Sequence, residues 1–339
     1  MCKIKQSRKW LSLVVSMAMV LSIGVFLTGC GNSAESQIEE KVEATLDDVA
    51  SGGKALTDNI SFDSLNKVGV ETDTFLEAYL KDFDYTIEVG KIGEEAKEAT
   101  ATVTVTMKKY GIFGDNLNLE ADEMVAAKDF LDLTKKKRYE KAVNDVTNAI
   151  DATTPEEIKI EFQFAKEKEE WVPSEDVTVS VINGLFPEED VEKVDAAVYR
   201  YIWKYDGMTA GEVVAEMKKA GLAIGEIQNY DENTDPNGLL GRPNQYIEKT
   251  TFRDNRISDP YDLAYYDDGT LDNDFGGTLE VFDSIKDRKT RQEYIESVTS
   301  TTGLGATYTY ARANMLLRMS FDLTPSEAVE YEKEFLQMD

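Results

Sequence analysis

The sequence predicts an α+β protein of two domains, in each of which helices pack against an antiparallel sheet. Segments with helical spacing and segments with strand-like alternation follow one another along 339 residues. The predicted strands come as adjacent pairs, which is typical of hairpins. The length exceeds what one small core occupies. We expect a leader at residues 1–29, a tether at 30–35, and domains at 36–186 and 187–339.

The first 30 residues have the layout of an export signal. Four basic residues come first, Lys3, Lys5, Arg8 and Lys9. An uncharged apolar run from Leu11 to Leu27 follows, and the small residues Thr28 and Gly29 lead to Cys30. This order is that of a cleaved signal peptide. The alternative is an uncleaved membrane-spanning helix, for which the run is at the short end of the roughly 17–25 residues required.

The segment Leu27-Thr28-Gly29-Cys30 resembles the bacterial lipobox. The resemblance implies that Cys30 receives the lipid (a diacylglycerol thioether, with palmitate-type chains) and that the precursor is cut before it. We therefore expect a lipoprotein held by its lipid on the extracytoplasmic face of the cell membrane.

The composition excludes several partners and chemistries. The net charge is −28, with 65 acidic and 37 basic residues, so we expect no nucleic-acid partner and little attraction to anionic lipid headgroups. Cys2 and Cys30 are the only cysteines, and both are consumed by processing under this interpretation. The chain has no histidine, which removes histidine-based nucleophilic catalysis and histidine zinc sites. We predict no catalytic residue and no cofactor.

The first half of residues 36–186 predicts two helices followed by two strands. Ser36-Gln37-Ile38-Glu39 has the capping-box form at the start of a helix, and helical spacing returns near residues 74–83. Alternation of apolar residues predicts strands at 85–89 and 101–107, joined by a charged turn.

A long helix and two more strands complete this domain. Helical spacing extends from about Ala121 to Ile150 and includes the basic run Lys135–Arg138, which we interpret as a solvated helix face. Residues 158–164 show the clearest strand alternation. A further strand starts at Trp171, and residues 177–186 close the unit.

This order of elements resembles the nuclear-transport-factor-two-like cone found in export domains of Gram-positive lipoproteins. The resemblance rests on the paired N-terminal helices, the Tyr85–Val89 and Ala101–Met107 hairpin, and the later Glu161–Trp171 hairpin. It covers about half of the mature chain and implies a pocket between sheet and helices. It assigns no catalytic residues.

Aromatic residues and two capping boxes mark the second domain. Tyr199, Tyr201, Trp203 and Tyr205 could stack on a sugar, but we interpret them as core packing. Capping boxes at Thr209–Glu212 and Thr324–Glu327 each start a helix, and Gly221 ends the first of these. Further elements are predicted as a strand through Phe252, a strand at 278–282, a helix at 284–298 and a hairpin of 306–311 with 315–321.

Asp231, Asn233 and Asp235 have the spacing of the first ligands of a calcium-binding EF-hand. Pro236 stands where that loop requires glycine and Arg242 where it requires glutamate, so an EF-hand is excluded. An irregular calcium site remains a candidate, but we favour an Asx-rich turn. The same two interpretations apply to a second acidic stretch, Asp267, Asp268, Asp272, Asn273 and Asp274.

Residues 239–243 and the closing strand, Leu-Thr-Pro turn and helix resemble a C-terminal domain that recurs in Gram-positive exported proteins, without an assigned activity. Arg242 in this segment is either a ligand-binding arginine or an ion-pair partner in a tight loop. The sequence leaves both open.

Three classes of function fit these observations. The first is a non-enzymatic binding or scaffold module whose ligand is a protein or a small molecule. The second is the substrate-binding lipoprotein of a transporter, and the third is a carboxylate-based hydrolase of wall polymers or glycans. We favour the first, because histidine is absent and because paired strands do not match the alternating strand–helix order of transporter-binding proteins.

Overall fold

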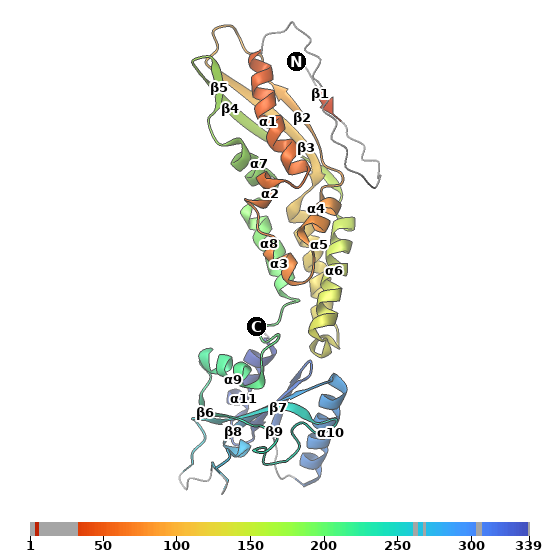
Figure 1. The fold of residues 1–339 in the computed structure, drawn as a ribbon, viewed down its shortest axis with the longest axis vertical. Helices are drawn as coiled ribbons and strands as arrows, with labels where there is room; N and C mark the ends of the chain where they lie inside the picture. Colours follow the sequence, from red (N-terminus) through yellow and green to blue (C-terminus); the bar gives the residue numbers. More distant parts are fainter. Residues whose placement is uncertain (1–3, 7–32, 260–263, 267–268, 303–306, 338–339) are drawn as a thin grey trace. The chain divides into compact units, whose positions relative to one another are not determined.

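The structure is a computed structural model, and the predicted α+β class is confirmed: two antiparallel sheets pack against helices (Figure 1). It describes residues 4–6, 33–259, 264–266, 269–302 and 307–337. The chain divides into two compact units, and each is described by itself. Unit 1 comprises residues 1–123 and 139–201, and unit 2 comprises residues 124–138 and 202–339.

Unit 1 contains a sheet with the strand order β1-β2-β3-β4-β5. Its strands are β1 (Ile4–Gln6), β2 (Asp84–Val89), β3 (Glu98–Lys108), β4 (Pro155–Glu167) and β5 (Glu170–Pro173). Its helices are α1 (Ala34–Ala50), α2 (Lys54–Thr57), α3 (Asp63–Lys67), α4 (Thr72–Tyr79), α7 (Val177–Leu185) and α8 (Glu188–Tyr199). Two longer helices, α5 (Tyr110–Ala126) and α6 (Lys135–Ala152), begin or end in unit 2.

Alternation along β3 decides which face of this sheet is buried. Val103 and Val105 are fully buried, whereas the threonines between the apolar residues are partly exposed. Val103 pairs with Ile87 of β2 on one side and with Ile160 of β4 on the other, so apolar side chains share one face. Helices α1 and α7 contact this sheet (Figure 1).

Several predicted boundaries in unit 1 are wrong. Helix α1 starts at Ala34, because Ser33 rather than Ser36 caps it. The predicted long helix is two helices separated by a short 3-10 turn (Phe130–Asp132). Helix α5 begins at Tyr110, although Gly111 and Gly114 disfavour a helix. A Cβ at Gly111 would meet only the carboxylate of Asp190 in α8, a side chain that can turn aside, whereas a Cβ at Gly114 would lie 3.2 Å from Cγ2 of Val194 in α8, so Gly114 allows α8 to pack closely.

Unit 2 has the strand order β6-β7-β8-β10-β9. Its elements are α9 (Ala210–Lys219), β6 (Ile224–Asn229), β7 (Tyr246–Asp254), a 3-10 turn (Asn273–Phe275), β8 (Gly276–Phe282), α10 (Ile285–Thr302), β9 (Thr307–Arg312), β10 (Met315–Ser320) and α11 (Pro325–Leu336). Both predicted capping boxes are confirmed, at Thr209 with Glu212 and at Thr324 with Glu327.

The two faces of the unit 2 sheet differ in polarity. Phe252, Leu279 and Leu317 form the core with residues of α9 and α11. The opposite face carries polar side chains from three neighbouring strands: Lys249, Thr251, Thr278 and Glu280, which are buried, and Arg318, which is partly exposed. Register places these residues on one face, because paired residues of antiparallel strands point the same way.

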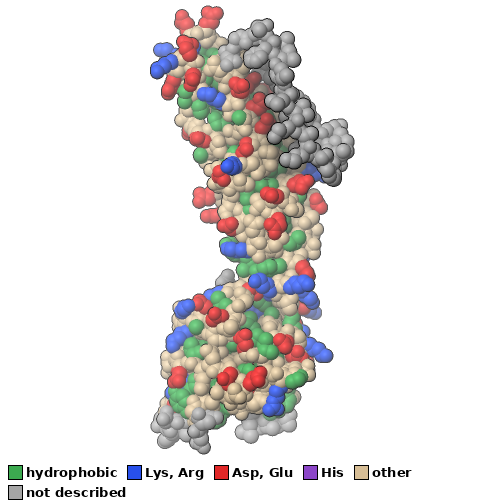
Figure 2. Space-filling view, viewed as in Figure 1, with side chains coloured by type: hydrophobic (Ala, Val, Ile, Leu, Met, Phe, Trp, Pro, Cys, Tyr) green, Lys and Arg blue, Asp and Glu red, His purple; other side chains and the backbone are tan. Residues whose placement is uncertain are grey.

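Charged groups of both signs are interspersed on the visible surface (Figure 2). Among the helices of the described residues, none is both long enough and apolar enough to cross a membrane.

Candidate functional site

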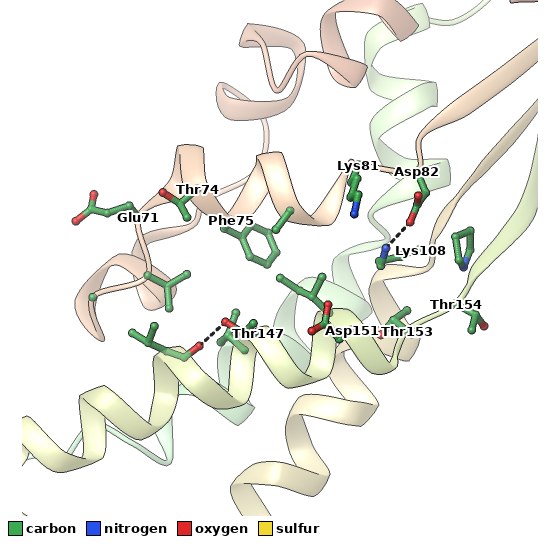
Figure 3. A pocket seen from close by; sticks show the side chains of 17 residues that line it. Glu71, Thr74, Phe75, Lys81, Asp82, Lys108, Thr147, Asp151, Thr153 and Thr154 are labelled. Carbon is green, nitrogen blue, oxygen red and sulfur yellow. Dashed lines mark hydrogen bonds and ion pairs between the residues drawn. The ribbon is translucent and has the colours of Figure 1, made fainter. Parts of the chain in front are cut away.

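The candidate site is a groove in unit 1 with a volume of about 660 Å³. It runs between α4 and α6 and ends where β3 finishes and β4 begins (Figure 3). This volume is within the range of small-molecule sites, roughly 300–1,000 Å³. The lining includes Phe75, Ala78, Val143, Val146 and Ile150.

An aromatic cluster fixes the floor of the groove. The ring of Phe75 lies 5.3 Å from that of Tyr79 and 5.5 Å from that of Phe113, measured between centroids. The Tyr79 hydroxyl donates a hydrogen bond of 2.6 Å to the carbonyl of Lys108, which ties α4 to the end of β3. Buried aromatic pairs of this kind hold a rigid surface, so the apolar floor is preformed.

The two ends of the groove differ in charge. Lys81, Asp82 and Lys108 lie at one end, and Glu71 lies at the other (Figure 3). Lys108 is nearly buried and its Nζ lies 2.8 Å from Asp82 Oδ2. Lys81 is exposed and makes no hydrogen bond or ion pair within the described part of the chain. It therefore leaves a cation available to a ligand at this end.

The groove has the chemistry of a binding site for an amphipathic molecule. Its centre is apolar, while hydroxyl groups of Thr74 and Thr147 and the carboxylate of Asp151 lie along its walls. Thr147 already donates to the carbonyl of Val143 within its own helix, at 2.9 Å. The arrangement can hold an apolar body and pair with an anionic group at Lys81.

The structure does not describe the lipobox. Leu27, Thr28, Gly29 and Cys30 lie outside the described residues, so the lipidation prediction rests on the sequence.

Asp231 and Asp235, both candidate metal ligands, instead accept hydrogen bonds from the protein. Asp231 Oδ1 accepts from the backbone N–H groups of Asn233 and Thr234, each at 2.9 Å, which is an Asx turn. Asn233 is exposed. Within the described residues, no group of three acidic side chains is placed to hold a metal ion.

Asp235 is buried and organises the loop that follows it. Its Oδ2 accepts from the Tyr246 hydroxyl at 2.7 Å and from the backbone of Leu239 and Leu240, and its Oδ1 lies 2.8 Å from Lys249 Nζ. Burial would raise the pKa of this carboxyl, but the hydrogen bonds from Lys249 and Tyr246 outweigh it and lower the pKa to about 2. Asp235 is therefore an ionised structural residue.

The other predicted candidates are dispersed. Arg242 is exposed, and its side chain makes no hydrogen bond or ion pair within the described residues. Asp267 and Asp268 lie outside those residues, and Asp272 caps the 3-10 turn that contains Asn273 and Asp274. Of the described candidates in this set, Arg242, Asp272, Asn273 and Asp274, none lines the groove.

Sequence reasoning missed Lys81 and Lys108 as site residues. Lys81 lies two residues beyond the end of α4, inside the helix predicted at 74–83, and Lys108 is the last residue of β3. A single lysine at the end of an element has no distinguishing pattern. Their proximity depends on how α4 packs against the sheet, through the Tyr79 hydrogen bond described above.

Comparison with protein-family models, with curated proteins and with solved structures returned no match. The functional argument is therefore based on the site itself.

Proposed function

We propose that this chain is a lipoprotein, anchored to the extracytoplasmic face of the membrane through Cys30, that binds a ligand without catalysing a reaction. The observation that carries the binding function is the groove between α4 and α6, with its apolar floor and its available cation at Lys81. The anchor is supported by the sequence from Lys3 to Cys30.

The ligand proposed for the groove is a small amphipathic molecule with an apolar body and one anionic group. Phe75, Val146 and Ile150 offer the apolar contact, and removal of apolar surface from water contributes about 25 cal/mol per Å². Lys81 favours an anion at one end and Glu71 disfavours one at the other, so the groove also orients the ligand.

A fluorescent probe tests the groove. We expect 1-anilinonaphthalene-8-sulfonate, an aromatic body with one sulfonate, to bind residues 30–339 saturably. Ala78→Trp should weaken its binding about tenfold, equivalent to about 1.4 kcal/mol, because the new ring fills the groove from its exposed rim. Fluorescence titration measures both affinities.

Two variants make this test specific. Val179→Trp adds the same ring at an exposed position of unit 1 outside the groove, and it should leave the affinity unchanged. Lys81→Gln should weaken binding by up to about fivefold, because an exposed ion pair contributes roughly 0.2–1 kcal/mol. Equal affinities for Ala78→Trp and Val179→Trp would contradict the assignment of the ligand to the groove.

Processing of the precursor tests the anchor. In a bacterial host treated with an inhibitor of lipoprotein signal cleavage, the chain should retain residues 1–29 and run as the heavier precursor. Cys30→Ser should do the same without inhibitor, because the lipid acceptor is lost. Cys2→Ser, which changes the one other cysteine, should be processed normally. A mature size for Cys30→Ser would refute the lipobox.

A further inference from the structure

Trp203 in unit 2 lies between two buried guanidinium groups. The guanidinium carbon of Arg138 is 3.5 Å from the centroid of the indole ring, and that of Arg312 is 3.7 Å from it. One face of the ring cannot hold two planar groups at this distance, so the arginines occupy opposite faces. Cation–π attraction favours each contact, but the two cations repel each other.

The predicted solvated face at Lys135–Arg138 is wrong for Arg138, which is fully buried. Asp206 explains the burial, because both of its oxygens accept from Arg138 Nη2, at 2.5 and 2.6 Å. Asp206 also accepts from the backbone N–H of Trp203 at 3.2 Å. The single carboxylate is thus committed to Arg138.

Among the described residues, Arg312 has no acidic side chain as an ion-pair partner. Arg312 is only 3% exposed, yet no carboxylate of the described residues lies within ion-pair distance of its guanidinium group. Its Nη1 donates to the carbonyl of Leu336 at the end of α11. Burial, and then the charge of Arg138, lower the pKa of Arg312. The charge of Asp206 opposes this lowering, but its oxygens bond to Arg138 rather than to Arg312. Buried charges in proteins are normally paired, and among the described residues no carboxylate pairs directly with Arg312.

Three buried nitrogen donors beside this cluster have no acceptor among the described residues: Arg312 Nε, Trp203 Nε1 and Gln337 Nε2. Gln337 is adjacent, because its Oε1 accepts from the backbone of Lys204 and it follows Leu336 in the chain. Arginine and tryptophan side chains offer donors and no acceptor. These donors and the positive charge of Arg312 are matched by a ligand group that is negatively charged and accepts several hydrogen bonds.

The neighbouring chain segment adds positive charge. Residues 124–138 contain four lysines and Arg138, with Asp129 and Asp132 as the two acids. Asp132 is already paired with Arg288 and Lys289. Lys135, Lys136 and Lys137 are exposed. A local excess of cations raises the concentration of anions at the surface.

We propose that Arg312, Trp203 and Gln337 form a binding site for a small oxyanion, of the carboxylate or phosphate class. A water molecule would satisfy at most two of the donors and would not compensate the charge. The site belongs to unit 2 and is independent of the ligand proposed for unit 1.

Inorganic phosphate and acetate are the probes. The protein is residues 30–339 with Trp171→Phe, so that Trp203 is its one tryptophan. Each anion is titrated at pH 7 with sodium chloride adjusted to constant ionic strength. We expect a saturable change in tryptophan emission and, at 100 times the dissociation constant, a rise in melting temperature of roughly 5–10 °C. If only one of the two anions gives a saturable change, that anion shows whether the ligand is a carboxylate or a phosphate.

Variants assign the effect to the cluster. Arg312→Gln should abolish saturation, whereas Arg242→Gln, which removes an exposed arginine of the same unit, should leave it unchanged. Replacing Lys135, Lys136 and Lys137 together by glutamine preserves the buried contacts and should weaken binding several-fold. The proposal is overturned if the parent protein shows no saturable change. It is also overturned if Arg312→Gln binds with unchanged affinity or, where that variant does not fold, if the triple-lysine variant does.

Discussion

Asp235→Ala is expected to lower the free energy of unfolding of unit 2 by about 3–5 kcal/mol, because it removes one partner of a buried ion pair. Lys249 would remain buried without its counterion, and Tyr246 would lose its hydroxyl acceptor. The backbone N–H groups of Leu239 and Leu240 would also lose theirs. Urea unfolding in a Trp171→Phe background, followed through Trp203, measures the transition of unit 2.

Asp231→Ala is the matched control, since it removes a carboxylate four residues away. Asp231 is exposed and its bonds lie within its own turn, so its removal should lower the free energy of unfolding far less than Asp235→Ala does. If the two variants were equally stable, Asp235 would not have the structural role described here.

The effect of Asp235→Ala should depend on pH. Hydrogen bonds hold the folded pKa at about 2, below the unfolded value of about 3.9. The ionised carboxylate therefore contributes stability above about pH 4, and this contribution is lost as the pH falls through about 2. Its size is about 2–3 kcal/mol. The difference in unfolding free energy between parent and variant should shrink by that amount between pH 5 and pH 2.

Gly276→Ala is expected to destabilise unit 2 by about 4 kcal/mol or more, which is exceptional for a single substitution. A Cβ at this position would lie 1.9 Å from the carbonyl oxygen of Phe252 and 2.8 Å from the Cα of Arg253. These are backbone atoms of the paired strand β7, so no side-chain rotation can relieve the overlap. Strands β7 and β8 would have to separate at this end.

Gly93→Ala provides the control for Gly276→Ala. No atom lies within 4 Å of a Cβ built at Gly93, and its φ is not in the left-handed region, so the change should be within about 0.5 kcal/mol. Thermal unfolding of both variants is sufficient to compare them. A Gly276→Ala protein with the parent melting temperature would show that the two strands are not in this register.

The parts of the fold that could be predicted from the sequence depend on short-range interactions. The capping boxes at Thr209 and Thr324 involve residues three apart, and both are present. The strands around Val103 and Ile160 were predicted because one face of each is buried and the side chains alternate. Such features need no knowledge of a distant partner.

The features that could not be predicted depend on partners far along the chain. Burial of Arg138 requires Asp206, 68 positions later. Helix α5 includes Gly111 and Gly114, and the close approach of α8 to Gly114 involves Val194, which lies 80 positions further along the chain. The groove requires α4 and α6 to lie opposite each other, and no local pattern in either helix specifies this. Asp235 could be singled out as an unusual acid, but its buried lysine partner could not.

Unit 2 is built from two separate stretches of the chain, and this affects the order in which the protein can fold. The carbonyl of Leu131 accepts from the backbone of Ala313 at 2.6 Å, and Asp132 pairs with Arg288, 156 positions later. A chain that emerges N-terminus first, from the ribosome or across the membrane, therefore presents Asp132 156 residues before its partner Arg288. Until that partner emerges, the apolar side chains of residues 124–138 have no core of their own. Residues 139–201 are made meanwhile and complete unit 1, so the segment synthesised first for unit 2 is among the last to be buried.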